Sequence, residues 1–138
     1  MPTRFAGLGL KAAGARPEGA PHSIYQLLNH ISYWQDWVLK WLDGEDPPAP
    51  KHASGGWPGE PVPVNAREWL RAVRTFQTGL AKLDRQTRGS ELLVVRGKYT
   101  RMGMLLAIAS HNSYHAGQVV ALRQRLGAWP PPSGGLTW

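Results

Sequence analysis

Two histidines four residues apart, His111 and His115, are the residues of this 138-residue chain whose type and spacing most clearly suggest chemistry. They lie in the longest uninterrupted helical pattern, which runs from about Thr100 to Gly127. An α-helix turns by about 100° per residue, so residues four apart stand one above the other on the same face, about 6 Å apart. Two imidazoles at that spacing can bind one metal ion.

The two histidines continue an apolar stripe of this helix, which predicts that they face the protein interior. The stripe consists of Met104, Ile108, His111, His115, Gln118 and Leu122. A buried imidazole needs hydrogen-bond partners or a metal ion. Core histidines bonded to carbonyls or water are the commoner explanation of an isolated HxxxH pattern, so the metal hypothesis needs a third ligand.

His30 is the candidate third ligand, because it lies on a tryptophan-rich face of a second predicted helix, from Ser23 to Asp43. Ser23 can cap this helix, and Gly44 ends it. A single histidine on such a face is usually a core residue with an ordinary hydrogen bond, so the residues alone leave both interpretations open. His52 lies in a loop, where we expect it to be exposed rather than a ligand.

The segment from residue 44 to 64 is rich in proline and glycine, which predicts a long surface loop. Long loops often carry function, so this one either closes over a site, with Trp57 as an anchor on the bundle, or is a tolerated insertion. A third helix is predicted from Asn65 to Gln86, because Asn65 to Glu68 resembles a capping box and an apolar helical period follows.

We expect little regular structure in the two remaining segments of the chain. A first helix from Thr3 to Ala13 is expected to be short and weak, because interior glycines cost about 1 kcal/mol each relative to alanine. Residues 87–99 are expected to form a linker, because a single strand there would have no sheet to join. The expected fold is therefore an all-α, up-down-type four-helix bundle with a short or incomplete first helix.

Length and composition set wider bounds. The chain has the length of a single domain, spanning residues 1–138, and it has no cysteine, so any thiol chemistry needs an external thiol. We find no apolar run long enough to span a membrane and no signal peptide, which makes a cytoplasmic protein the default expectation.

The formal net charge of +7 raises nucleic acid as a partner. The basic residues are scattered over predicted helices and loops without a dense run or a recognisable reading motif, so nucleic-acid binding is not favoured. Binding of a small anionic substrate would explain the basic residues equally well. They include Arg67, Arg71, Arg74, Lys82, Arg85, Arg88, Arg96, Lys98, Arg101, Arg123 and Arg125.

Two sequence blocks carry a resemblance to a known family. The first runs from Pro21 to Ile31 (PHSIYQLLNHI) and is followed by Trp34; the second runs from His111 to Gln118 (HNSYHAGQ). Arg123, Gly127 and the segment Trp129-Pro130-Pro131 follow the second block. Together they resemble the second-helix and fourth-helix motifs of the DinB superfamily of four-helix bundles, which includes YfiT-like proteins.

This resemblance implies that His30, His111 and His115 bind one divalent metal ion, commonly zinc or nickel, with coordination positions left open for water or substrate. A closed structural site would normally have four protein ligands, so three favour chemistry. The other ring nitrogen of each histidine should be held by a hydrogen-bond acceptor. Asn112, Tyr114 and Gln118 are nearby candidates.

The family is similar in fold to thiol transferases that use bacillithiol or mycothiol and to a maleylpyruvate isomerase. We therefore expect a metal-dependent thiol S-transferase, in which the metal-held thiolate attacks a carbon electrophile. A metal-dependent hydrolase and a noncatalytic metal-binding stress-response protein are the alternatives. Relatives usually have a fuller first helix, and this departure, with the abundance of tryptophan, leads us to expect a homodimer.

Overall fold

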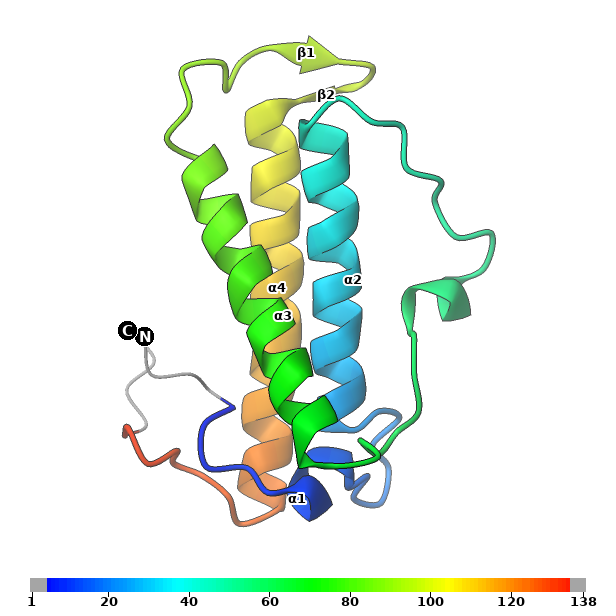
Figure 1. The fold of residues 1–138 in the computed structure, drawn as a ribbon, viewed down its shortest axis with the longest axis vertical. Helices are drawn as coiled ribbons and strands as arrows, with labels where there is room; N and C mark the ends of the chain where they lie inside the picture. Colours follow the sequence, from blue (N-terminus) through cyan, green and yellow to red (C-terminus); the bar gives the residue numbers. More distant parts are fainter. Residues whose placement is uncertain (1–4, 135–138) are drawn as a thin grey trace.

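Three long helices form the body of the protein (Figure 1). The computed structural model describes residues 5–134. The long helices are α2 (Ile24–Leu42), α3 (Ala66–Gln86) and α4 (Arg101–Arg125), and two short elements accompany them, α1 (Leu10–Gly14) and the 3-10 helix η1 (Ala53–Gly56). The expected all-α helical bundle is thus confirmed, with long helices within one or two residues of the predicted bounds.

The first helix is even shorter than expected. α1 begins only at Leu10, and Thr3, where the sequence predicted its start, lies outside the described residues. Gly7 has a φ of +74°, a conformation that cannot belong to a right-handed helix. The chain before α1 instead packs as an irregular segment, in which Phe5 makes edge contacts with the rings of Trp69 and Phe76 on α3.

Side-chain caps fix the beginning of each long helix. Ser23 forms a full capping box on α2, since its hydroxyl accepts from the Gln26 amide and the Gln26 side chain accepts from the Ser23 amide. Asn65 caps α3 and Thr100 caps α4. On α3 the capping box is incomplete, because the Glu68 side chain accepts from the Val64 amide instead of the amide of the cap residue Asn65.

Buried Arg123 fixes the far end of α4. The helix ends in a Schellman motif, in which the Gly127 amide donates to Gln124 and the Ala128 amide donates to the Arg123 carbonyl. The Arg123 guanidinium donates back to the Ala128 carbonyl at 2.8 Å and reaches the Ala6 carbonyl at 3.0 Å. One side chain therefore ties the end of α4 to the N-terminal segment.

Two apolar clusters form the core, one toward each end of α2. The first joins Leu27 and Leu28 to Trp69 on α3 and Val119 and Leu122 on α4. The second cluster joins Val38, Trp41 and Leu42 of α2 to Leu83 of α3 and to Met104, Leu105 and Ile108 of α4. α2 and α4 run in opposite directions (Figure 1), so His30 on α2 and His111 and His115 on α4 all come between the two clusters.

The segment expected to be a plain linker contains a small hairpin. β1 (Val95–Arg96) pairs antiparallel with β2 (Tyr99–Thr100), so the predicted absence of a sheet is wrong. β1 finds its partner in the chain that follows directly, because Gly97 adopts a φ of +63° and lets the chain reverse. No helix among residues 5–134 combines the length and apolarity that a membrane span requires.

Candidate metal site

Three imidazoles converge between α2, α4 and the loop that follows α2. One ring nitrogen from each of His30, His111 and His115 lies within 4.8 Å of the other two. The Nε2 atoms of His30 and His111 are 3.1 Å apart. His30 and His115 are 7% and 6% exposed, and His111 is half-buried. The structure therefore brings together the three histidines that the sequence singled out.

Each of these imidazoles directs its Nδ1 at an oxygen atom. His30 Nδ1 lies 2.5 Å from the Gly56 carbonyl oxygen, and His115 Nδ1 lies 2.7 Å from Gln118 Oε1. His111 Nδ1 has a longer contact, 3.4 Å, with Asn112 Oδ1. Because these oxygens accept a hydrogen bond, they favour the tautomer with the proton on Nδ1, which leaves each Nε2 with a free lone pair.

The spacing between the Nε2 atoms of His30 and His111 fits a shared metal ion. Metal–nitrogen bonds of about 2.0–2.1 Å in a tetrahedral site put two ligand nitrogens about 3.3 Å apart. The observed 3.1 Å between the Nε2 atoms of His30 and His111 is close to that spacing. The donor set is three neutral nitrogens, a set that zinc, nickel and other divalent transition metals accept.

Burial favours the neutral form of His30 and His111. Desolvation lowers the pKa of His30 to about 4, outweighing the hydrogen bond to Gly56, which raises it. Desolvation also lowers the pKa of His111, against the opposing contact with Asn112. At neutral pH both rings are therefore unprotonated, the state that a metal ion requires.

The loop between α2 and α3 closes one side of the site. The Trp57 indole lies flat between two imidazoles, with its ring centroid 3.6 Å from that of His22 and 3.7 Å from that of His30. Gly56, which supplies the carbonyl to His30, is packed so closely on Trp34 that a Cβ there would lie 3.1 Å from the indole nitrogen. Trp57 is thus the anchor that the sequence suggested.

Hydrogen bonds to α2 hold this loop at both ends. The Trp37 indole nitrogen donates to the Pro48 carbonyl, and the Ser23 hydroxyl donates to the Pro61 carbonyl at 2.6 Å. Arg96 binds the Trp41 and Gly44 carbonyls and reaches Asp46 at 3.2 Å. The position of Gly56 and Trp57 over His30 is therefore set by contacts beyond the site itself.

The other candidate residues lie outside the cluster. His52 is exposed, as expected, and His22 is separated from His30 by the Trp57 indole. Among the expected hydrogen-bond acceptors, Gln118 and Asn112 contact ligand histidines directly, whereas the Tyr114 hydroxyl only accepts from Gln118. Sequence reasoning missed the Gly56 carbonyl, because a backbone atom in an irregular loop leaves no signal in residue types.

Comparison with known proteins identifies a family. The family model described as the DinB superfamily matches residues 1–119, which include His30, His111 and His115. No curated protein and no solved structure matches the chain.

Proposed function

The chain belongs to the DinB superfamily, and we propose that it is a metal-dependent enzyme whose single divalent ion is bound by His30, His111 and His115. The observation that carries this proposal is the common arrangement of the three imidazoles, each with Nδ1 directed at an oxygen and with one ring nitrogen within 4.8 Å of the other two rings' nitrogens. Core histidines that served packing alone would have no reason to share this orientation.

Three ligands favour a site that does chemistry. Within residues 5–134, no carboxylate or fourth imidazole joins the cluster. Structural zinc sites normally use four protein ligands, whereas sites that bind substrate leave positions open. A divalent ion held here would supply positive charge that lowers the pKa of a coordinated water or an external thiol.

The reaction we favour is thiol S-transfer, with zinc or nickel as the metal and a low-molecular-weight thiol such as bacillithiol as cosubstrate. The thiol must come from outside, since the chain has no cysteine. Aromatic rings border the site: Trp57 stacks on His30, and the ring centroid of Trp34 lies 6.4 Å from that of His111. These rings offer an apolar surface to a carbon electrophile. Low-molecular-weight thiols stay reduced in the cytosol, which fits a cytoplasmic location.

A metal analysis followed by a thiol screen tests this function. The purified protein should contain about one divalent ion per chain, and the loaded protein should consume a thiol and an electrophile in equal amounts. Turnover of an ester or amide without any thiol would instead identify a hydrolase. A loaded protein that turns over neither would be the noncatalytic metal-binding protein.

We also propose that the protein forms a homodimer. The abundance of tryptophan does not support the dimer, because the described tryptophans are buried or half-buried. The support comes instead from the face of α4 opposite the histidines, which carries no charge from Met102 to Ala121 and exposes Leu106 by 61%. A second copy packed on this face would remove that apolar surface from water.

A further inference from the structure

A second site lies between α2 and α3, where the structure has a groove of about 350 Å³. We propose that this groove binds a small anion with at least two negative charges, held by Arg71, Arg74 and Lys82 of α3 over a polar floor formed by Ser32 and Gln35 of α2. Sugar bisphosphates and tricarboxylates have this chemistry.

The groove is separate from the histidine cluster. At about 100° per residue, Ser32 projects from α2 about 200° away from His30, on the opposite face of the helix. Figure 1 shows the same separation, since η1 and the loop over His30 lie on one side of α2 and α3 lies on the other. Binding in the groove therefore involves none of the residues assigned to the metal.

The floor of the groove is polar and lacks partners. Gln35 is 1% exposed, and neither its Oε1 nor its Nε2 has a hydrogen-bond partner; the Ser32 hydroxyl is likewise buried without one. Leaving such groups unpaired destabilises a protein, so they usually have a partner. Because these polar atoms are covered, an anion in the groove can reach the Gln35 amide only if the Gln35 side chain rotates.

Gly79 makes room for this amide. A Cβ at position 79 would collide with Gln35 Oε1, so a larger residue on α3 would displace the amide from the helix interface. The chain thus combines a glycine with a buried glutamine where an ordinary helix contact would use two apolar side chains. This combination indicates that the polar floor is a built feature of the groove.

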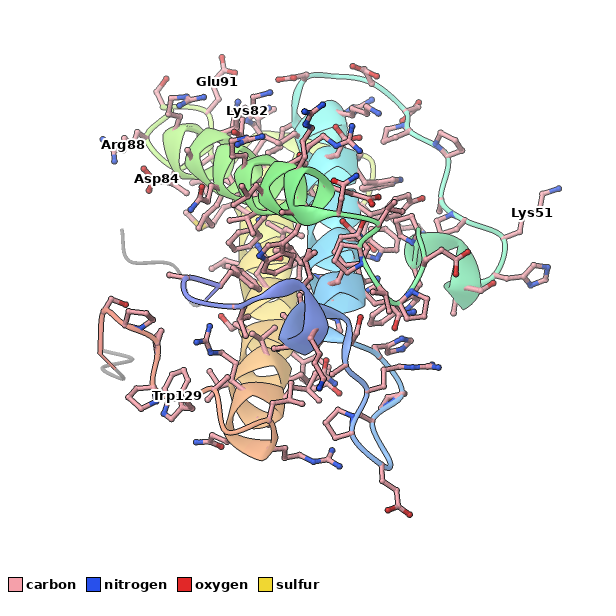
Figure 2. The ribbon with its side chains drawn as sticks, turned by 60° about the horizontal axis from the view of Figure 1, so that its bottom comes forward. Lys51, Lys82, Asp84, Arg88, Glu91 and Trp129 are labelled. Atoms are coloured by element: carbon pink, nitrogen blue, oxygen red, sulfur yellow. The ribbon has the colours of Figure 1, made fainter. Side chains whose placement is uncertain are left out.

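The rim of the groove has an excess of positive charge. None of Arg71, Arg74 and Lys82 forms an ion pair within residues 5–134. Asp36, the acidic residue of the groove, is paired with Lys40 at 2.8 Å. Figure 2 shows Asp84 on the side of α3 away from α2, where it pairs with Arg88 at 2.7 Å. Arg71 lies near enough to Glu68 for their charges to interact, so Arg74 and Lys82 carry most of the excess. An excess of positive charge in one groove favours a multivalent anion.

The size of the groove favours a small molecule over nucleic acid. Its volume is in the range of small-molecule sites, roughly 300–1,000 Å³. A nucleic acid would follow the whole basic side of α3, including Arg67 and Arg85, which do not line the groove. These two arginines therefore provide matched controls on the same helix.

Calorimetry on the metal-loaded protein with inorganic phosphate, fructose 1,6-bisphosphate and citrate tests the proposal. We expect at least one probe to bind, and Arg71→Ala, Arg74→Ala and Lys82→Ala each to weaken it about tenfold or more. Arg67→Ala and Arg85→Ala should change affinity by less than about twofold. Failure of all three probes to bind, equal losses in the control variants, or displacement by a single-stranded oligonucleotide would overturn the proposal.

Gln35→Leu gives an independent test of the floor. Because leucine removes an unpaired buried amide while keeping similar volume, we expect a Tm at least as high as that of the parent protein together with weaker anion binding. A lower Tm with unchanged anion affinity would contradict a ligand-binding role. His111→Ala should still bind the anion, and the groove variants should still bind the metal ion. Failure of the anion proposal can therefore be told apart from failure of the proposed metal-dependent function.

Discussion

The indole of Trp57 lies parallel to the imidazole of His30, with ring centroids 3.7 Å apart and 7° between the ring planes. The preceding residue, Gly56, contacts the edge of the same imidazole through its carbonyl oxygen. Two consecutive loop residues therefore hold one candidate ligand by its face and by its edge. These contacts favour a loop that closes over the candidate site above a tolerated insertion.

Replacing Trp57 should loosen the metal site. Trp57→Ala removes the surface against which His30 is held, and we expect metal affinity to fall about tenfold to hundredfold, as for other residues that orient a ligand. Trp57→Phe keeps a flat ring and should recover most of the affinity. Val64→Ala, at an 82% exposed position near the end of the same loop, is the control. Competition with a chelator measures all three, and equal affinities would show that the loop does not position His30.

Gln118→Leu tests the hydrogen bond to the second ligand on α4. The substitution removes the acceptor 2.7 Å from His115 Nδ1, so the ring loses its preferred tautomer and orientation. We expect metal affinity to drop about tenfold or more. Gln124→Leu, at an exposed position on the same helix, should leave affinity unchanged. A loss of equal size in both variants would mean that the effect is not specific to His115.

Metal content of five single variants tests the ligand set directly. His30→Ala, His111→Ala and His115→Ala should each lose most of the metal, because two remaining imidazoles cannot preserve a three-point chelate. His22→Ala and His52→Ala should retain it. Folding can survive the ligand substitutions, since metal-free buried imidazoles already carry a desolvation cost. Full occupancy in His30→Ala would show that the proposed triad is wrong.

The helices were predictable because their signals are local. Apolar periodicity and the caps at Ser23, Asn65 and Thr100 all lie within a few residues of the structure they determine. The inward direction of His30 and His111 was predictable for a similar reason, since each histidine occupies the inward stripe of its own helix. What periodicity alone could not supply was the pairing of the two stripes, which came from the resemblance to a family.

The loop contacts were not predictable, because they depend on long-range packing. No pattern in residues 44–64 indicates that the Gly56 carbonyl reaches His30, or that His22 stacks on the other face of Trp57. The unpaired Gln35 was also invisible in the sequence, since a glutamine on a helix is normally solvated. Its burial results from the approach of α3 at Gly79.

The proposed dimer predicts that one charge on α4 makes the protein monomeric. Leu106→Glu places a carboxylate on the uncharged face, where burial against a second copy would be costly. Leu70→Glu changes a 51% exposed leucine on α3 and should leave the dimer intact. Sedimentation at micromolar concentration measures both. A parent protein that sediments as a monomer would remove the dimer.

The metal-free protein should lose stability in acid through His30. Its pKa is lowered by burial from 6.5 to about 4, so between these pH values the unfolded chain binds a proton that the folded chain does not. Stability from this group is therefore fully present above about pH 6.5 and is lost as the pH falls toward 4, by an amount on the order of 3 kcal/mol. The lowered pKa of His111 acts in the same direction.

Urea unfolding with a chelator present, at several pH values between about 7 and 4.5, measures this loss. His30→Asn removes the titrating group and should flatten the dependence, whereas His52→Asn, at an exposed position, should follow the parent protein. In the metal-loaded protein, the free energy of unfolding should fall more steeply with decreasing pH, because protons compete with the ion for the same nitrogens. An acid-induced loss that is as steep in His30→Asn as in the parent would mean that the burial of this imidazole does not govern stability in acid.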